Sequence, residues 1–170
     1  MSQSISQRAA AGIGHNRPKQ RCCAVCGTPY GDDGRSLPHL KRFFAMLRLV
    51  YANWPESHDR QFASAEEMRA FLLIKAKHRV MAASIPLQGV NKDRAMMLVE
   101  AAFRAAGTYA FATPHGGNIV IFKPKSIAFA KLSHLEAVGI FQEVEDVITA
   151  ETGIDTKSLM QNGEQEDAHA

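Results

Sequence analysis

The sequence predicts one α+β domain, in which four helices and a small sheet of about three strands follow one another in the order α-α-β-α-β-β-α. The chain has 170 residues, of which 46% are hydrophobic and 22% charged, as in ordinary globular proteins. Four segments carry apolar residues at helical spacing, and three shorter segments are rich in β-branched or aromatic residues. Glycine and proline separate these segments. We therefore expect a domain that spans residues 36–161.

Two helices open the predicted domain. In the first, which runs through Pro38–Trp54, apolar side chains recur at spacings of three and four residues, and a proline follows. Ser36 can cap its first turn. The second helix is expected over Ala65–His78, because Ser64 and Glu67 have the spacing of a capping box. In that motif each side chain accepts a hydrogen bond from the other residue's backbone N–H.

The remaining elements follow from the same patterns. A short strand precedes a helix that Asn91 caps and Gly107 ends. Two strands joined by a Gly-rich hairpin loop come next, and a second capping box, from Ser133 to Glu136, begins the last helix, which ends at Gly153. The expected ranges are Val80–Leu87 for the first strand, Thr108–Thr113 and Asn118–Lys123 for the other two, and Pro114–Gly117 for the hairpin loop.

Segments of different composition flank this domain. Residues 1–20 are polar and are expected to be disordered, because they hold too few apolar side chains to fold alone. Residues 21–35 are rich in cysteine, glycine and proline and predict tight turns, and residues 162–170 form an acidic tail. No apolar run has the length of a secretory signal or a membrane span, so we expect a cytoplasmic protein without a membrane partner.

Charge is unevenly distributed along the chain. Residues 1–131 contain 19 Lys and Arg against 8 Asp and Glu, a net charge of +11, whereas residues 132–170 contain one lysine against nine carboxylates, a net charge of −8. A body this basic suggests a polyanion, nucleic acid in particular, as its partner. The alternative is that the cations are ordinary solvated side chains. The residues expected to contact phosphates are Arg42, Arg48, Lys75, Lys77, Arg79, Lys123 and Lys125.

Binding of a single strand calls for aromatic rings beside these cations. Most aromatic residues lie at core spacing, which leaves Tyr30, Tyr109 and Phe111 as candidates for stacking on bases. The segment Lys123–Ser126 follows a predicted strand and can offer backbone amides and a hydroxyl to a phosphate. Since no pattern indicates a recognition helix, we expect binding that is non-specific and sensitive to salt.

Three cysteines lie close together near the start of the chain. Cys23 and Cys26 have the two-residue gap that lets two thiolates bind one zinc ion, which is half of a structural site. Twelve residues separate Cys26 from His39, and Cys22 with His39 would complete a Cys₃His set, with His15 as a further candidate. The alternative is a reduced cysteine cluster without function. A zinc ion held in this way would stabilise the structure and would not activate water.

The sequence does not predict catalysis. Three neighbouring thiols resemble metal ligands more than a single activated nucleophile. The histidines are scattered, and Asp32 and Asp33 lie in a glycine-rich turn that explains them. We therefore expect a binding protein and not an enzyme. A nuclease is the enzymatic alternative, although the basic body lacks the clustered carboxylates that such an enzyme uses to hold metal ions.

Three stretches of the sequence resemble a phage-borne family of uncharacterised proteins. That family has a similar aromatic helix, a similar second helix that ends in histidine, and a similar KSIAFAKL turn before its last helix. The resemblance covers residues 36–155. The stretches that carry it are Pro38–Trp54, Ser64–His78 and Pro124–Val147.

The same order of features is similar to the NinB/Orf recombination mediators of lambdoid phages. This resemblance implies a homodimer that binds single-stranded DNA without sequence preference in a bacterial host. It also implies a role in loading or assisting a recombinase, with contact to the single-strand-binding protein. The expected function is therefore that of a non-catalytic accessory protein in phage or prophage DNA metabolism. The alternative is a zinc-stabilised interaction protein that inhibits or redirects a host factor.

Overall fold

The α+β class and the three-stranded sheet are confirmed by a computed structural model, which describes residues 37–87, 91–128 and 132–167 together with Cys22, Gly27 and Gly89. The two predicted segments before the domain and the Ser36 cap otherwise lie outside these residues. In the described part, no helix is long and apolar enough to cross a membrane. The elements are α1 (Leu37–Ala52), α2 (Ala65–Lys75), β1 (Arg79–Pro86), α3 (Lys92–Ala105), β2 (Phe111–His115), β3 (Asn118–Pro124), α4 (His134–Thr152) and α5 (Thr156–Asp167).

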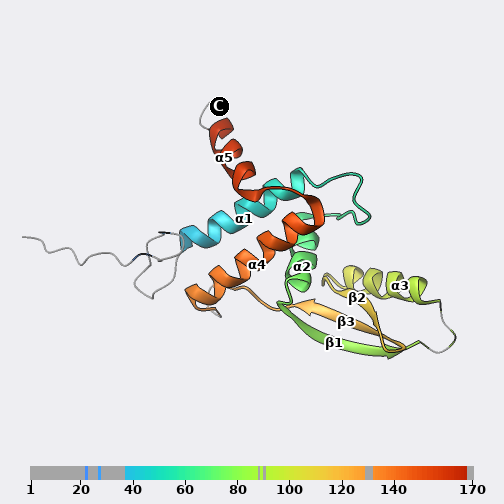
Figure 1. Cartoon of the computed structure of the whole chain (residues 1–170). Coiled ribbons are helices and arrows are strands. Elements are labelled where there is room, and N and C mark those ends of the chain that lie inside the picture. The colour runs from blue at the N-terminus through green and yellow to red at the C-terminus, as the bar shows by residue number, and fades with distance from the viewer. Residues whose placement is uncertain are drawn as a thin grey trace, which may run out of the picture.

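The sheet is antiparallel with the strand order β1–β3–β2, so that β3 is the central strand (Figure 1). A turn of two residues, Gly116 and Gly117, joins β2 to β3, and both have the positive φ that glycine adopts without strain. The hairpin loop is therefore shorter than predicted. Pro114 and His115 belong to β2 and pair with β3, and β2 itself begins later than the sequence indicates.

Helix α3 covers one face of the sheet and lies well apart from α5 (Figure 1). None of its residues is fully buried, because it packs on the sheet with one side only. This small second core is separate from the main one. It consists of Ala110, Ala112, Ile119 and Ile121, with Ala95, Met96, Val99 and Phe103 of α3 against them.

Helix α2 lies at the centre of the main core and contacts α1, α4 and β3. Seven of its eleven residues are buried, and Met68 and Leu72 have no exposed surface. A helix that is apolar on most sides must be surrounded, and here helices and the sheet surround it. The residues that enclose it include Phe43, Met46, Leu47, Val50, Phe111, Phe141, Val144 and Ile148.

One carboxylate, Glu67, is buried within this apolar helix and is only 3% exposed. It forms an ion pair with Arg104 of α3, whose Nε lies 3.0 Å from Glu67 Oε1. Its other oxygen accepts a hydrogen bond from Ala63 N–H at 2.9 Å. The predicted capping box therefore forms in part: Ser64 Oγ accepts from Glu67 N–H at 3.2 Å, but Glu67 bonds to the N–H of the residue before Ser64.

The C-terminal part of the domain contains a helix that the sequence analysis did not predict. The capping box at Ser133 and Glu136 is confirmed, and Gly153 ends α4 in a left-handed conformation. The chain then starts α5, because Asp155 Oδ1 accepts a hydrogen bond from Lys157 N–H at 3.0 Å. Helix α5 contacts α1 and buries Met160 in the main core. The predicted boundary between domain and acidic tail at residue 162 falls inside this helix.

Helix α2 ends at Lys75, earlier than predicted, in a turn that reverses the chain into β1. Lys77 N–H donates to Ile74 O and His78 N–H to Leu73 O, which is the hydrogen-bond pattern of a Schellman motif. This motif places Lys77 in the left-handed region, with φ of 61°. The same pattern ends α3, where Gly107 takes the equivalent position with φ of 69°.

We predict that Lys77→Gly raises the free energy of unfolding by about 1 kcal/mol, since only glycine adopts a left-handed φ without strain. The reverse change, Gly107→Lys, should lower it by a similar amount, because open space surrounds that position and leaves the backbone as the only source of strain. Urea unfolding of both variants measures the two effects. Equal stability of Lys77→Gly and the unchanged protein would contradict the assignment of strain.

We also predict that Glu67→Gln lowers the free energy of unfolding by about 1–3 kcal/mol, because the buried carboxylate loses its charge while Arg104 and Ala63 N–H still face it. The neighbouring Glu66→Gln is the matched control. Glu66 is exposed and pairs with Arg69 one turn away, so its loss should change stability by less than about 0.5 kcal/mol. Equal effects of the two changes would show that Glu67 has no special role.

Candidate nucleic-acid interface

A groove of about 530 Å³ lies where the end of β3 passes α1 and α2. Its lining combines apolar side chains with polar and charged ones. The segment 123–128, which leaves the sheet at Pro124, lines it on one side, and residues 107–109, between α3 and β2, also line it. The side chains that line it include Leu40, Phe44, Arg69, Leu73, Tyr109, Lys123, Lys125, Ser126 and Ile127.

Three cations line this groove, two of them predicted. Lys123 and Lys125 come from the end of β3, and the backbone N–H of Lys125 is fixed by a hydrogen bond of 3.0 Å to His78 O. Arg69 comes from α2 and was not predicted. Its guanidinium lies over the Phe44 ring, 5.4 Å from the ring centroid, and pairs with Glu66. Glu66 is the only carboxylate among the described residues that line the groove.

Aromatic rings accompany these cations. Phe44 and Tyr109 are half-buried in the groove wall, and the Tyr109 hydroxyl lies 3.1 Å from Ser64 Oγ. Of the aromatic residues predicted to stack on bases, Tyr109 is therefore at the groove. Phe111 is buried in the core, against Phe71, so its prediction as a stacking residue was wrong. Tyr30 lies outside the described residues.

Lys77 and Arg79 flank His78, whose carbonyl accepts the hydrogen bond of Lys125 N–H, so both lie beside the groove. Arg79 is opposite Pro124 in the strand register, and its guanidinium lies 3.9 Å from the centroid of the Phe122 ring. Lys123, in contrast, reaches the opposite face of the sheet, where its Nζ lies 4.8 Å from the Phe103 ring. The sheet end therefore presents cations on both faces.

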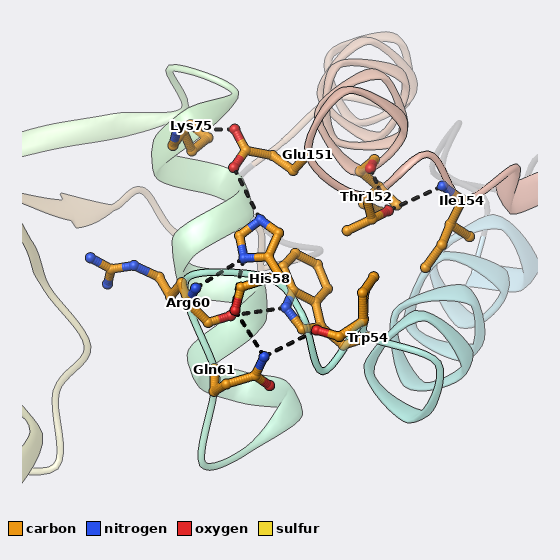
Figure 2. Close-up of polar contacts among 10 residues, drawn as sticks. Trp54, His58, Arg60, Gln61, Lys75, Glu151, Thr152 and Ile154 are labelled. Atoms are coloured by element: carbon orange, nitrogen blue, oxygen red, sulfur yellow. Dashed lines mark hydrogen bonds and ion pairs between the residues drawn. The ribbon is translucent and has the colours of Figure 1, made fainter.

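Lys75 is held by the acidic helix α4. Its Nζ donates a hydrogen bond of 3.0 Å to Glu151 Oε1, and His58 Nε2 lies 3.6 Å from the other oxygen of the same carboxylate (Figure 2). His58 Nδ1 lies 3.0 Å from Arg60 N–H and accepts its hydrogen bond. Both ring nitrogens of His58 are thus engaged in holding the loop before α2. Lys75 belongs to this network and does not line the groove.

Arg42 and Arg48 lie on exposed parts of α1, and Arg42 lines a second hollow of about 240 Å³ between α1, α4 and α5. This hollow is not purely basic, since Glu145 lines it together with Lys157. Burial raises the pKa of Glu145, and the charges of Lys157 and Arg42 oppose that shift. The seven predicted cations therefore do not form one stripe. Only Lys123 and Lys125 line the groove, with Lys77 and Arg79 next to it.

His78 lies behind the groove, between the end of α2 and the exit of β3. Burial lowers its pKa, and the charge of Lys125 adds to that shift, whereas a hydrogen bond with the Ser126 backbone and the charge of Glu143 oppose it. Its Nε2 is buried and has no hydrogen-bond partner among the described residues. Protonation of this ring would place a second positive charge next to Lys125, so the folded protein favours the neutral form.

The predicted zinc ligands are only partly within the described residues. Cys23 and Cys26 lie outside them, Cys22 is exposed, and His39 is half-buried in the first turn of α1. The ring of His134, the first residue of α4, lies 5.3 Å from the ring of His39. Within the described ranges, no group of three or more His, Cys, Asp or Glu side chains has the arrangement of a metal site.

Sequence reasoning missed three residues here: Arg69, Phe44 and His134. Phe44 and His134 occupy positions that helical periodicity or a capping box already explains, and Arg69 lies on the outer side of a helix. The spacing of apolar residues shows which side of each helix is buried, but it does not show which neighbour faces the other side.

Comparison with known proteins does not assign the chain to a family. No protein-family model matches it, and no match was found among curated proteins or solved structures.

We predict that acid weakens the fold in part through His78. Its folded pKa lies below the ordinary value of about 6.5, so as the pH falls past that value the unfolded chain binds the proton first and stability is lost. The His78→Asn variant keeps a short hydrogen-bonding side chain but does not titrate. Between about pH 7.5 and 5.5 it should therefore lose less stability than the unchanged protein.

Chemical denaturation at several pH values provides the measurement. His39, whose pKa is also lowered, chiefly by burial, is present in both proteins, so the difference between them reports His78 alone. Parallel stability curves for the two proteins would rule out this contribution of His78.

Proposed function

We propose that this protein binds single-stranded DNA without sequence preference, through the groove at the end of β3. The observation that carries this proposal is that Lys123, Lys125 and Arg69 line the same groove as two aromatic rings. Phosphate binding requires cations that converge from fixed positions, and base stacking requires rings beside them. Together these groups suit a flexible polyanion with exposed bases.

The electrostatics of the groove support an anionic ligand. The carboxylate in its wall, Glu66, is paired with Arg69, so the two lysines keep their charge available. Lys77 and Arg79 lie close by and can contact the phosphates that continue beyond the groove. The acidic helix α4 pairs with Lys75 on the other side of α2 instead. Because basic side chains lie at the groove and the acidic helix lies on the other side of α2, we expect nucleic acid to bind at the groove.

A single strand suits the groove better than a duplex. A volume of about 530 Å³ is in the range of a small-ligand pocket and can take only a short piece of chain at a time. Phe44 and Tyr109 line the groove and are half-buried, and stacking on such rings requires bases that are not paired in a duplex. The proposed role is non-catalytic: the described residues of the groove supply cations and ring surface for binding.

The resemblance to recombination mediators adds a biological role to this proposal. On that basis the protein would help load a recombinase in a phage or prophage system, with the single-strand-binding protein as a contact.

A homodimer is part of the same proposal. The edge of β1 supports it, since Val80, Met81 and Ile85 on this edge strand are 44%, 66% and 41% exposed. The other edge strand is partly covered, because Ala112 N–H donates to the Glu100 carboxylate.

The second candidate is a zinc-stabilised interaction protein that inhibits or redirects a host factor. The approach of His134 to His39 is the observation that favours a metal in this protein. Tight protein partners without retention of DNA would favour this candidate over the first.

We predict that affinity for an oligothymidine falls with salt, with a slope of log K against log [salt] of about −2 if three phosphates are neutralised. The Lys123→Glu/Lys125→Glu variant should lose most of this affinity and flatten the slope to about −0.7, the value for one remaining phosphate contact. Fluorescence anisotropy at several salt concentrations measures both quantities.

Lys92→Glu is the matched control. Lys92 is exposed at the start of α3, far along the sheet from the groove, so reversal of its charge should change affinity by less than about twofold (Figure 1). Affinity that does not depend on salt, or equal losses for the Lys92 variant and a single Lys125→Glu variant, would contradict the proposed site.

A further inference from the structure

The second hollow, between α1, α4 and α5, receives one charged side chain from each of these three helices. Its volume is about 240 Å³, and Arg42 of α1, Glu145 of α4 and Lys157 of α5 line it. The backbone N–H of Lys157 donates to Asp155 Oδ1 at 3.0 Å, which fixes the start of α5 beside the hollow. The hollow shares no lining residue with the groove at the end of β3, so the two are separate sites.

The three charges of the hollow do not pair with one another. Glu145 is half-buried, and its carboxylate forms no hydrogen bond or ion pair with any described residue. Burial and, less strongly, the charge of Asp146 raise its pKa, whereas the charges of Lys157 and Arg42 lower it. Both cations are therefore close enough to act on the carboxylate, although neither bonds to it. Since a carboxylate that loses water is normally hydrogen-bonded or paired, the hollow offers an unpaired charge of each sign to a bound molecule.

The apolar side chains that line the hollow are buried, whereas its two cations are exposed. Met46 and Phe141 are each 3% exposed and Met160 is 8% exposed, while Arg42 and Lys157 lie at the surface. A molecule that enters the hollow therefore meets charges on the solvent side and apolar surface further in. Methionine side chains adapt to ligands of different shape, so the apolar part does not require one particular group.

We propose that this hollow binds a free α-amino acid with an apolar side chain. The carboxylate of the amino acid contacts Arg42 and Lys157, its ammonium group contacts Glu145, and its side chain packs on Met46 and Met160. A purely anionic ligand would face the carboxylate of Glu145, and a purely cationic one would face the two cations. A ligand with one group of each sign matches all three. The inference does not depend on the proposed binding of DNA.

The size of the hollow and one further polar group fit such a ligand. Pockets for drug-sized molecules have volumes of about 300–1,000 Å³, so 240 Å³ suits a smaller molecule. Thr156, the first residue of α5, also lines the hollow and is only 5% exposed. Its hydroxyl forms no hydrogen bond with any described residue, so it is available to the charged end of the ligand.

The test is a titration of the full chain with L-leucine, followed through the backbone amide signals in NMR spectra. We expect saturable shifts that are confined to residues near the hollow on α1, α4 and α5. Isocaproate, which lacks the ammonium group, and isoamylamine, which lacks the carboxylate, should each bind at least about tenfold more weakly. L-alanine should also bind at least about tenfold more weakly, because its side chain covers little of the apolar surface.

Two variants and their matched controls assign the charges. Glu145→Gln and Arg42→Gln should each weaken the binding of L-leucine by at least about tenfold. Glu145→Gln should in addition bind isocaproate more tightly than the unchanged protein does, since it removes a like charge; a merely structural role of Glu145 would not produce this gain. Glu143→Gln on α4 and Arg48→Gln on α1 are the controls. Both residues are exposed and do not line the hollow, so L-leucine should bind these variants as it binds the unchanged protein.

Three results would overturn the proposal. The first is the absence of saturable shifts with L-leucine, or shifts that lie outside the three helices. The second is equal affinity for L-leucine and isocaproate, which would indicate a site for carboxylates without recognition of the ammonium group. The third is an equal loss of affinity in Glu145→Gln and Glu143→Gln.

Discussion

The burial of α2 is the constraint on which the rest of the structure depends. This short helix is apolar on most of its surface, so it is stable only when α1, α4 and the sheet enclose it. Glu67 fixes the position of α2 relative to α3, because its buried carboxylate must bond both to Arg104 of α3 and to the N–H of Ala63. This ion pair thus joins the main core to the separate core under α3, as does the pair between Arg60 and Glu100 of α3.

The position of the groove follows from this arrangement. The same α2 that fills the core presents Arg69 on its outer side, and the chain that leaves β3 must pass it in order to reach α4. Lys125 is held there by its backbone bond to His78, at the end of α2. Acidic residues of α4 are used elsewhere, as the pairing of Glu151 with Lys75 shows. The basic and acidic parts of the sequence therefore lie on different sides of α2: the cations of the groove on one side and helix α4 on the other.

Much of the fold can be predicted from local patterns, but contacts between distant segments cannot. Alternation and the Gly116–Gly117 pair predict the β2–β3 hairpin, and Ser133 with Glu136 predicts the start of α4. The end of α2 was misplaced because Lys77 occupies a position that usually shows glycine. Helix α5 was missed because its polar sequence gives little periodic signal, and it packs on the core mainly through Met160 and the partly buried Leu159. The approach of His134 to His39 depends on the packing of two helices nearly 100 residues apart.

The central claim is that nucleic acid occupies the groove at the end of β3, and a hydrogen-exchange footprint tests it most directly. Backbone amide exchange would be compared in the full chain with and without an oligonucleotide of about 15 thymidines. The account predicts slower exchange in residues 107–109 and 123–128, with no change in β1 beyond Met81 or in α5. Protection confined to α4 and α5, or no protection at all in the presence of the bound oligonucleotide, would contradict it.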